Sequence, residues 1–268
     1  MPAHVVYELT KHPKAPPRIG LLFSMHTETA NVWSHLVAAV WATWRVCEVR
    51  AEPNVLPVAR LYMQFFFLGA VVCFTFSALA HLLGGGTVLP PAQRHLIWRI
   101  DQLGICILML SSYAPALRWG FRCRPWTRRA YFTVIAAPLI GGLVFLMASQ
   151  GRRRSLPQAQ AYFVGCMCFT VGFSLVPLFH WASFAPPADR LLLGIPCLVQ
   201  IIIYTLGFVF YRWRPLEVLA HRMGRPTLFD LAGSHLVWHI LVVAAVATWD
   251  TGGREMIKRR WDENSCEQ

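Results

Sequence analysis

Two histidines lie four residues apart just before an apolar run near the end of the chain. His235 and His239 precede the run 240–247, and this spacing places both imidazoles on one face of a helix. A third histidine, His81, ends an earlier apolar run, and Ser77 lies one helical turn before it. Because polar groups are costly in an apolar setting and are usually functional there, these residues predict a site.

The chemistry that this set of residues favours is zinc binding. Three neutral imidazoles leave the fourth tetrahedral position open, as in catalytic zinc sites, and zinc acidifies a bound water into a nucleophile. We therefore predict Zn²⁺ as the cofactor, with His81, His235 and His239 as its ligands. Asp101 would orient or deprotonate the water, and Ser77 would hold the water or a substrate carbonyl, so both are predicted catalytic residues.

Simpler interpretations of the same side chains stay open. A histidine near a membrane interface often bonds only to water or lipid headgroups, although three histidines on one face favour a metal. Asp101 lies close to the start of an apolar run, so it is equally a helix-end carboxylate stabilised by the helix dipole. The sequence does not separate the structural and catalytic interpretations of Asp101.

The composition is that of a membrane protein. Of the 268 residues, 56% are hydrophobic and 14% are charged, and the mean hydropathy is +0.44, which is too apolar for an ordinary soluble domain. The net charge of +12 comes from loops and tails between apolar stretches. We therefore expect attraction to anionic lipid headgroups and no nucleic-acid partner.

Seven apolar stretches are long enough to cross a bilayer, which takes about 20 residues each. They lie near 31–50, 58–83, 96–117, 129–149, 160–181, 190–211 and 234–250. Short connections containing proline and glycine separate them, so adjacent helices should pack antiparallel. We predict an all-α integral membrane protein, with a seven-transmembrane helix bundle over residues 21–250, an N-terminal tail (1–20) and a polar C-terminal tail (251–268).

Alternation of the spans determines which membrane face each polar residue occupies. The end of the second span and the starts of the third and seventh share one face, which brings Ser77, His81, Asp101 and the pair His235–His239 together. His180 ends the fifth span on the opposite face and is not expected to be a ligand. The Lys and Arg residues divide almost equally between the faces, so the positive-inside rule does not give the orientation.

Polar side chains also crowd the start of the first span, between residues 26 and 35. Thr27 or Thr29 is expected to cap the helix, and Asn31 and His35 share one helix face. A structural hydrogen-bond network is the favoured interpretation, with direct catalysis as the alternative.

Cysteines inside the apolar stretches should behave as small apolar residues. Two of them, Cys166 and Cys168, cannot share a helix face, which argues against a cysteine metal site. The cysteines in predicted spans include Cys73, Cys106, Cys166, Cys168 and Cys197.

Several short motifs follow one another in a specific order along the chain. They are His26–Thr29 with Asn31, Trp33 and His35; Phe66–Val71 leading to Ser77 and His81; Asp101 with Gly104 and Ile105; and Phe229–Asp230 leading to Ser234, His235, His239 and Leu241–Ala245. In this order they resemble the progestin and adipoQ receptor family, most closely its adiponectin-receptor branch. The segment before the last span, Gly224–Gly233, departs from the compact pattern of that family.

This resemblance implies a seven-helix bundle with a cytosolic N-terminus and an outward C-terminus. It also implies that His81, His235 and His239 hold zinc near the cytosolic side, with Asp101 close to a zinc-bound water. Members of the family look like intramembrane hydrolases, with cleavage of ceramide to sphingosine and fatty acid as the leading proposed activity, and relatives act in lipid signalling and membrane-lipid homeostasis.

The leading hypothesis is a zinc-dependent, ceramidase-like lipid amide hydrolase, whose partners are a ceramide-like membrane lipid and a fatty acid product. The alternative is a ligand-sensing membrane receptor, for an adipokine or a steroid, in which zinc is structural. An extracellular ligand and a second copy of the chain, in a homodimer, are further candidate partners. A proton-relaying transporter is disfavoured because few acidic residues lie within the spans. The expected location is the plasma membrane or the Golgi and endoplasmic reticulum.

Overall fold

The structure, a computed structural model, describes residues 20–23, 26–52, 55–84, 89–149, 156–258 and 266. Within these residues every regular element is a helix, so the all-α prediction is confirmed for this part of the chain. The predicted N-terminal tail (1–20), apart from Gly20, lies outside the described residues, as does most of the C-terminal tail beyond residue 258.

Helices occupy all seven stretches that the apolar pattern predicts. The elements are η1 (Gly20–Phe23), α1 (Thr29–Ala51), α2 (Pro57–Gly84), α3 (Pro91–Gly120), α4 (Pro125–Ala148), α5 (Leu156–Phe173), α6 (Leu175–Phe184), α7 (Pro187–Asp189), η2 (Arg190–Gly194), α8 (Ile195–Trp213), α9 (Pro215–Arg222) and α10 (Ser234–Lys258). Proline is the first residue of α2, α3, α4, α7 and α9, where its missing N–H has no helical partner to lose. The short helix α9 has no counterpart in the sequence prediction.

Six helical segments are long and apolar enough to cross a membrane, so the protein is a multi-pass integral membrane protein. The first predicted span, α1, is not among the six, because polar residues at its start and the charged Arg45, Glu48 and Arg50 near its end make it less apolar. The six segments are Pro57–Gly84, Gln93–Gly120, Pro125–Ala148, Pro157–Phe184, Pro187–Trp213 and Ser234–Glu255.

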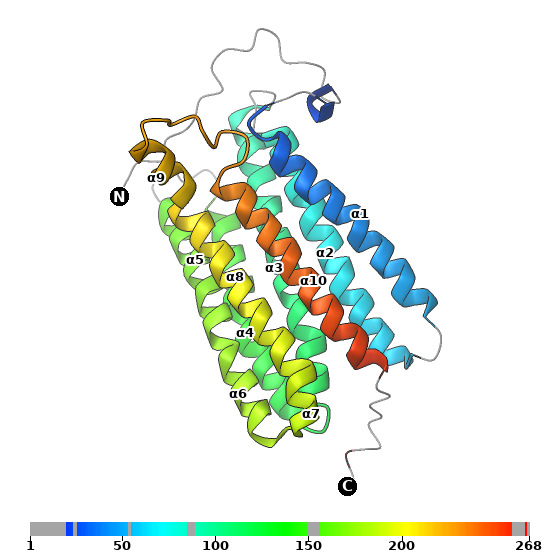
Figure 1. Cartoon of the computed structure of the whole chain (residues 1–268). Coiled ribbons are helices and arrows are strands. Elements are labelled where there is room, and N and C mark those ends of the chain that lie inside the picture. Colours follow the sequence, from blue (N-terminus) through cyan, green and yellow to red (C-terminus); the bar gives the residue numbers. More distant parts are fainter. Residues whose placement is uncertain are drawn as a thin grey trace.

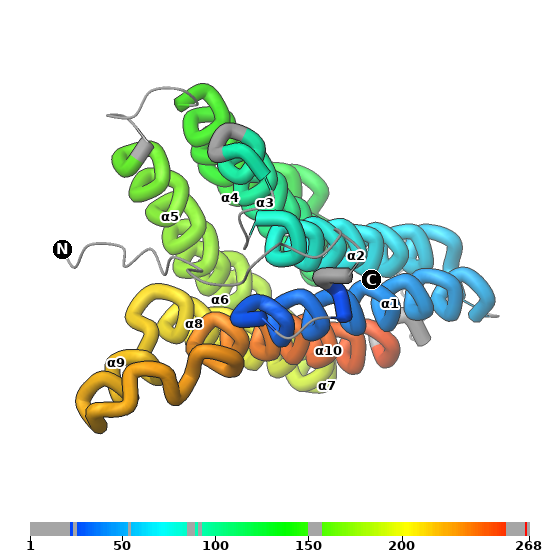
Figure 2. Tube along the Cα trace, turned by 90° about the horizontal axis from the view of Figure 1, so that it is seen from above, coloured from blue at the N-terminus to red at the C-terminus, as the bar shows by residue number. Residues whose placement is uncertain are grey.

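The long helices run side by side along the bundle (Figure 1). Helix α2 packs between α1 and α3, and α10 packs against α8, α1 and α2. Figure 2 shows α4 and α5 on the side of the bundle away from α1. The starts of α1, α3 and α10 and the last turn of α2 lie at one end of the bundle (Figure 1). We call this the histidine end, because His81, His235 and His239 lie in these segments.

Two glycines allow α2 and α3 to approach closely. A Cβ atom on Gly69 would lie 2.6 Å from Cβ of Ser111, and a Cβ atom on Gly104 would lie 3.0 Å from Cα of Cys73. Larger residues at either position would push the helices apart, because these neighbouring atoms cannot move without the helix that carries them. The close contact places α3 beside the part of α2 that carries Ser77.

A buried ion pair joins α1 to α10 toward the end opposite the histidines. Arg45 is 1% exposed, and its Nη2 donates to Oδ1 of Asp250 at 2.7 Å. Glu48 and Arg254 extend the network. Because a charge buried among helices is costly unless it is paired, this contact holds α1 against α10.

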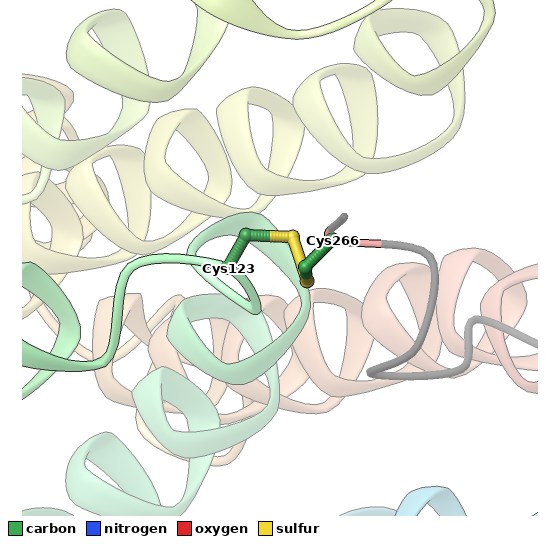
Figure 3. Close-up of a disulfide and its surroundings, with 2 residues drawn as sticks. All are labelled: Cys123 and Cys266. Atoms are coloured by element: carbon green, nitrogen blue, oxygen red, sulfur yellow. A yellow bond between two sulfur atoms is a disulfide. The ribbon is translucent and has the colours of Figure 1, made fainter. Parts of the chain in front are cut away.

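A disulfide ties the turn between α3 and α4 to the C-terminal tail. It joins Cys123 and Cys266 (Figure 3), a pairing that was not predicted from the sequence. The alternation of the spans was a usable signal, because it puts the end of the third span and the tail after the seventh on the same face. The five cysteines assigned to predicted spans are free: Cys73, Cys106, Cys166, Cys168 and Cys197.

Candidate metal centre

The three predicted ligands come together at the histidine end of the bundle. One nitrogen from each of His81, His235 and His239 lies within 4.8 Å of the others, and Nε2 of His235 is 3.1 Å from Nε2 of His81. His81 and His239 are 2% and 1% exposed. The structure therefore brings His81 to two imidazoles that lie more than 150 residues further along the chain.

The start of α10 is fixed by hydrogen bonds to α9. The backbone N–H of Ser234 donates to Oε1 of Glu217 at 3.0 Å, and the backbone N–H of Leu216 donates to Oγ of Ser234 at 3.0 Å. These bonds satisfy a free N–H at the first turn of each helix. They hold the first turn of α10, so His235 and His239 project from a fixed position.

Glu28, which is not among the predicted site residues, fixes the orientation of His81. Oε2 of Glu28 lies 2.8 Å from Nδ1 of His81 and also accepts a bond from Nδ2 of Asn31 at 2.8 Å. Burial alone would raise the pKa of Glu28, but the hydrogen bonds from His81 and Asn31 outweigh it and hold that pKa below its usual range. An ionised Glu28 accepts only, so Nδ1 of His81 carries a proton, and in the neutral imidazole that a metal requires the lone pair is then on Nε2.

Ser34 determines in a similar way which nitrogen of His239 carries the proton. The single hydroxyl proton of Ser34 is donated to the backbone carbonyl of Asn31 at 2.9 Å. Oγ of Ser34 lies 3.1 Å from Nδ1 of His239, and it can only accept there because its one proton is already used. Nδ1 of His239 is therefore the donor, and Nε2 of His239 is left with a lone pair.

This donor set fits a metal ion. Ligands about 2.0–2.1 Å from a tetrahedral zinc ion lie about 3.3 Å from each other, close to the 3.1 Å between Nε2 of His81 and Nε2 of His235. Metal-binding histidines typically donate their second nitrogen to a carboxylate or another oxygen, as His81 and His239 do here. The cluster of His81, His235 and His239 could thus hold a metal ion.

The two predicted catalytic residues lie beside the histidines without joining the ligand cluster. Asp101 and Ser77 line the same cavity as His235 and His239, and the Ser77 side chain lies beside the Asp101 carboxyl group. Ser77 is 3% exposed. The predicted convergence of these side chains is therefore observed, and their catalytic roles stay predictions.

The predicted polar network at the start of α1 takes an unforeseen form. The helix begins at Thr29 and its N-cap is Glu28, whose side chain does not cap the helix. The prediction that Thr27 or Thr29 is the cap is therefore wrong. Glu28 occupies the cap position, and its carboxylate contacts His81 instead. His35 stacks on His239, with ring centroids 3.7 Å apart. The signal for Glu28 was available, since span alternation places the start of α1 at the histidine end.

His180 takes no part in the centre. Its Nδ1 lies 2.7 Å from the hydroxyl of Tyr131, and its ring packs against Phe121 and Phe184. Its surroundings are therefore aromatic, and the cluster of potential ligands within the described residues does not include it.

A cavity of about 510 Å³ leads away from the histidines into the bundle. It is lined at one end by Asp101 and His235 and at the other by Gly120 and Trp181. Asp101 and Gly120 are about 28 Å apart along α3. Most of the lining between them is apolar, so the cavity suits a long apolar ligand.

The fold and the site together define a multi-pass helical membrane protein whose three clustered histidines could hold a metal. A profile of the family described as haemolysin-III related matches residues 23–249. The chain therefore belongs to the haemolysin-III-related family, and its relatives confirm the resemblance to the progestin and adipoQ receptors.

The chain is similar to several named members of this group. It is 29% identical over 252 residues to an adiponectin receptor protein of Drosophila melanogaster, a match that covers 91% of this chain and 54% of the relative. It is 27% identical over 273 residues to a progestin and adipoQ receptor-like protein of Caenorhabditis elegans, covering 96% and 59%. A heptahelical transmembrane protein of Oryza sativa subsp. japonica is 29% identical over 198 residues, covering 71% and 80%. The chain thus spans little more than half the length of the first two relatives.

The hydrogen bond from His81 to Glu28 predicts a specific defect in metal binding. Glu28→Gln keeps the shape of the side chain but removes the charge that stabilises the donor at Nδ1, so zinc affinity should fall about 10- to 100-fold. Titration of metal-depleted protein with zinc against a competing chelator measures this change. Glu48→Gln, at the other end of α1, is the control and should bind zinc like the wild type; an unchanged affinity in Glu28→Gln would contradict the role given to Glu28.

Proposed function

We propose that the protein is a seven-span membrane hydrolase that uses zinc, held by His81, His235 and His239, to cleave the amide bond of a ceramide-like lipid. The observation that carries this proposal is the position of the three imidazoles at one end of a long apolar cavity, beside a carboxylate and a hydroxyl. A fatty acid and a sphingoid base would be the products.

The side chains around the histidines suit the proton transfers of amide hydrolysis. Zinc held by the three histidines would supply an acidified water and a positive charge for the carbonyl oxygen. The Asp101 carboxylate accepts the proton that the attacking water loses and delivers it to the leaving amine nitrogen. Ser77, which lies beside Asp101 in the lining of the same cavity, would help to orient the carboxylate.

The cavity accounts for the choice of a lipid. Leu108, Leu117 and Val242 are among its apolar lining residues, and an acyl chain lying along them would leave its amide carbonyl at the histidine end. Burial of the chain would exclude water from the cavity and hold the amide near Asp101. Chains of different length would then be distinguished by how far they reach along α3.

Helix α1, the first span in chain order, is proposed to cross the membrane as well, which brings the number of spans to seven. Its outward face carries the apolar residues Val37, Val40 and Trp44, which are 61%, 66% and 55% exposed, whereas Asn31 and His35 face the bundle interior and are buried. A helix with an apolar outer face and polar groups turned to its neighbours is what a membrane span in a bundle requires.

The disulfide supports a cytosolic histidine end and a cytosolic N-terminus. Cys123 and Cys266 lie beyond the ends of α3 and α10, opposite the histidines, and disulfides form in oxidising compartments rather than in the cytosol. The face with the disulfide would then be outward or lumenal, in the plasma membrane or in the Golgi and endoplasmic reticulum.

A receptor in which zinc is structural is the second candidate. It is favoured by the names of the adiponectin receptor protein and the progestin and adipoQ receptor-like protein to which the chain is similar. In this case the metal would tie α2 to α10 while an adipokine or a steroid changes the packing of the helices. Normal signalling by a folded protein that no longer hydrolyses lipid would favour this candidate.

Replacing the proposed proton acceptor should separate hydrolysis from metal binding. Asp101→Asn should retain zinc, because Asp101 is outside the ligand cluster, and should lower the rate of ceramide hydrolysis by a factor of about 10²–10⁴. Product release from a labelled ceramide and the metal content of the same preparation measure the two effects. Asp230→Asn, at an exposed position, is the matched control. Ceramide hydrolysis at the wild-type rate by Asp101→Asn, or by a zinc-free triple histidine variant, would refute the proposed zinc-dependent hydrolase activity.

The proposed orientation can be tested with the disulfide cysteines. Cys123→Ser frees Cys266, so a membrane-impermeant maleimide applied to intact cells should label this variant more strongly than the wild type. The double variant that carries both Cys123→Ser and Cys266→Ser is the control, and its labelling should return to the wild-type level. For a protein in internal membranes, the same extra labelling should appear only after those membranes are permeabilised as well. Extra labelling that appears as soon as the plasma membrane alone is permeabilised would reverse the orientation.

A further inference from the structure

Polar side chains interrupt the apolar lining midway along the cavity. Ser112 on α3 and Gln200 and Tyr204 on α8 all line it. We call these three residues the polar belt. The proposed hydrolysis at the histidines makes no use of them, so their presence inside an apolar cavity calls for a separate explanation.

Helix geometry gives the depth of the belt. Ser112 lies about 16 Å along α3 from Asp101, at a rise of about 1.5 Å per residue. Tyr211, whose ring centroid is 6.0 Å from that of His235, marks the histidine end of α8, and Tyr204 lies about 10 Å further along that helix. The belt is therefore about 10–16 Å from the histidines, well beyond the reach of a polar group bonded there.

The hydrogen-bonding capacity of the belt is not used up within the described residues. The hydroxyl oxygen of Tyr204 is buried and makes no hydrogen bond of normal geometry there, although Ser112 and Gln200 flank it. Ser112 donates its proton to the backbone carbonyl of Leu108 at 2.7 Å, which leaves its oxygen free to accept. Nε2 of Gln200 reaches the carbonyl of Ala245 only at 3.5 Å.

A buried hydroxyl without a partner is unfavourable, so the belt is suited to a ligand group that supplies one. A ligand hydroxyl both donates and accepts, and it matches a belt that offers the Tyr204 proton and the Ser112 oxygen. A plain hydrocarbon chain would cover these groups without pairing them. An apolar chain with one hydroxyl at this depth matches the apolar lining and also forms hydrogen bonds with the belt.

We propose that the polar belt binds a hydroxyl group in the middle of an acyl chain, so that the cavity prefers lipids whose acyl chain is hydroxylated about 10–16 Å from its carbonyl or carboxyl group. The inference rests on the proposed function in one respect: the carbonyl or carboxyl end of the chain lies at the histidines. It adds a specificity that hydrolysis alone does not require.

Binding of three fatty acids to the purified full chain in detergent tests the proposal. The ligands are stearate, stearate with a hydroxyl at mid-chain, and stearate with a hydroxyl next to the carboxylate. The mid-chain form should bind about three- to tenfold more tightly than either of the others, as expected for one added hydrogen bond. Equal affinities would overturn the proposal and indicate that the belt is filled by water.

The variant Tyr204→Phe assigns the preference to the belt. It removes one hydroxyl and keeps the ring, so it should bind stearate as the wild type does and lose the preference for the mid-chain form. Tyr162→Phe, at an exposed position on α5, should keep the preference. A preference that survives Tyr204→Phe would overturn the role of the belt. Failure of all three acids to bind would overturn the acyl pocket of the proposed function and this inference with it.

Discussion

The hydrogen bond between Glu28 and His81 is the interaction on which the rest of the centre depends. It joins the residue before α1 to the last turn of α2 at 2.8 Å, in a setting where an unpaired polar group would be costly. Because the ionised carboxylate can only accept, Nδ1 of His81 carries a proton, and Nε2, which faces His235, is the nitrogen that a neutral His81 offers to a metal. Ser34 imposes the same arrangement on His239 from the next turn of α1. A helix that contributes no ligand to the cluster thus determines which nitrogens the other two helices present to a metal.

The remainder of the bundle keeps α1, α2 and α10 in the positions that this arrangement needs. The ion pair between Arg45 and Asp250 holds α1 to α10 away from the histidines, and the close contact at Gly69 holds α2 to α3. With the helices fixed at these points, the ligand nitrogens of the three imidazoles are held within 4.8 Å of one another, where a metal could draw them together. The cavity beside them then has a polar end, where Asp101 and Ser77 lie, and a long apolar interior. That combination suits an amphipathic lipid whose reactive bond lies close to its polar group.

Much of the fold and of the candidate site could be predicted from the sequence, for reasons that differ between residues. Apolar runs of bilayer length gave the helices, and the alternation of their directions brought His81, Asp101 and His235 to one end. The residues that were missed act through side-chain directions that no spacing specifies. Glu28 looked like part of a helix start, and only the packing of α1 on α2 shows that its carboxylate reaches His81. The disulfide between Cys123 and Cys266 and the depth of the polar belt likewise depend on which helices are neighbours, which the order of the spans does not determine.

The central claim is that His81, His235 and His239 form a zinc site, and the metal content of the purified protein tests it most directly. Elemental analysis of protein prepared without added metal should find one zinc ion per chain in the wild type. His239→Ala should lose this zinc, and His180→Ala, which removes a histidine outside the cluster, should retain it. A wild-type protein that is folded and free of stoichiometric zinc, even after exposure to it, would contradict the account, as would a His239→Ala variant that binds zinc as the wild type does.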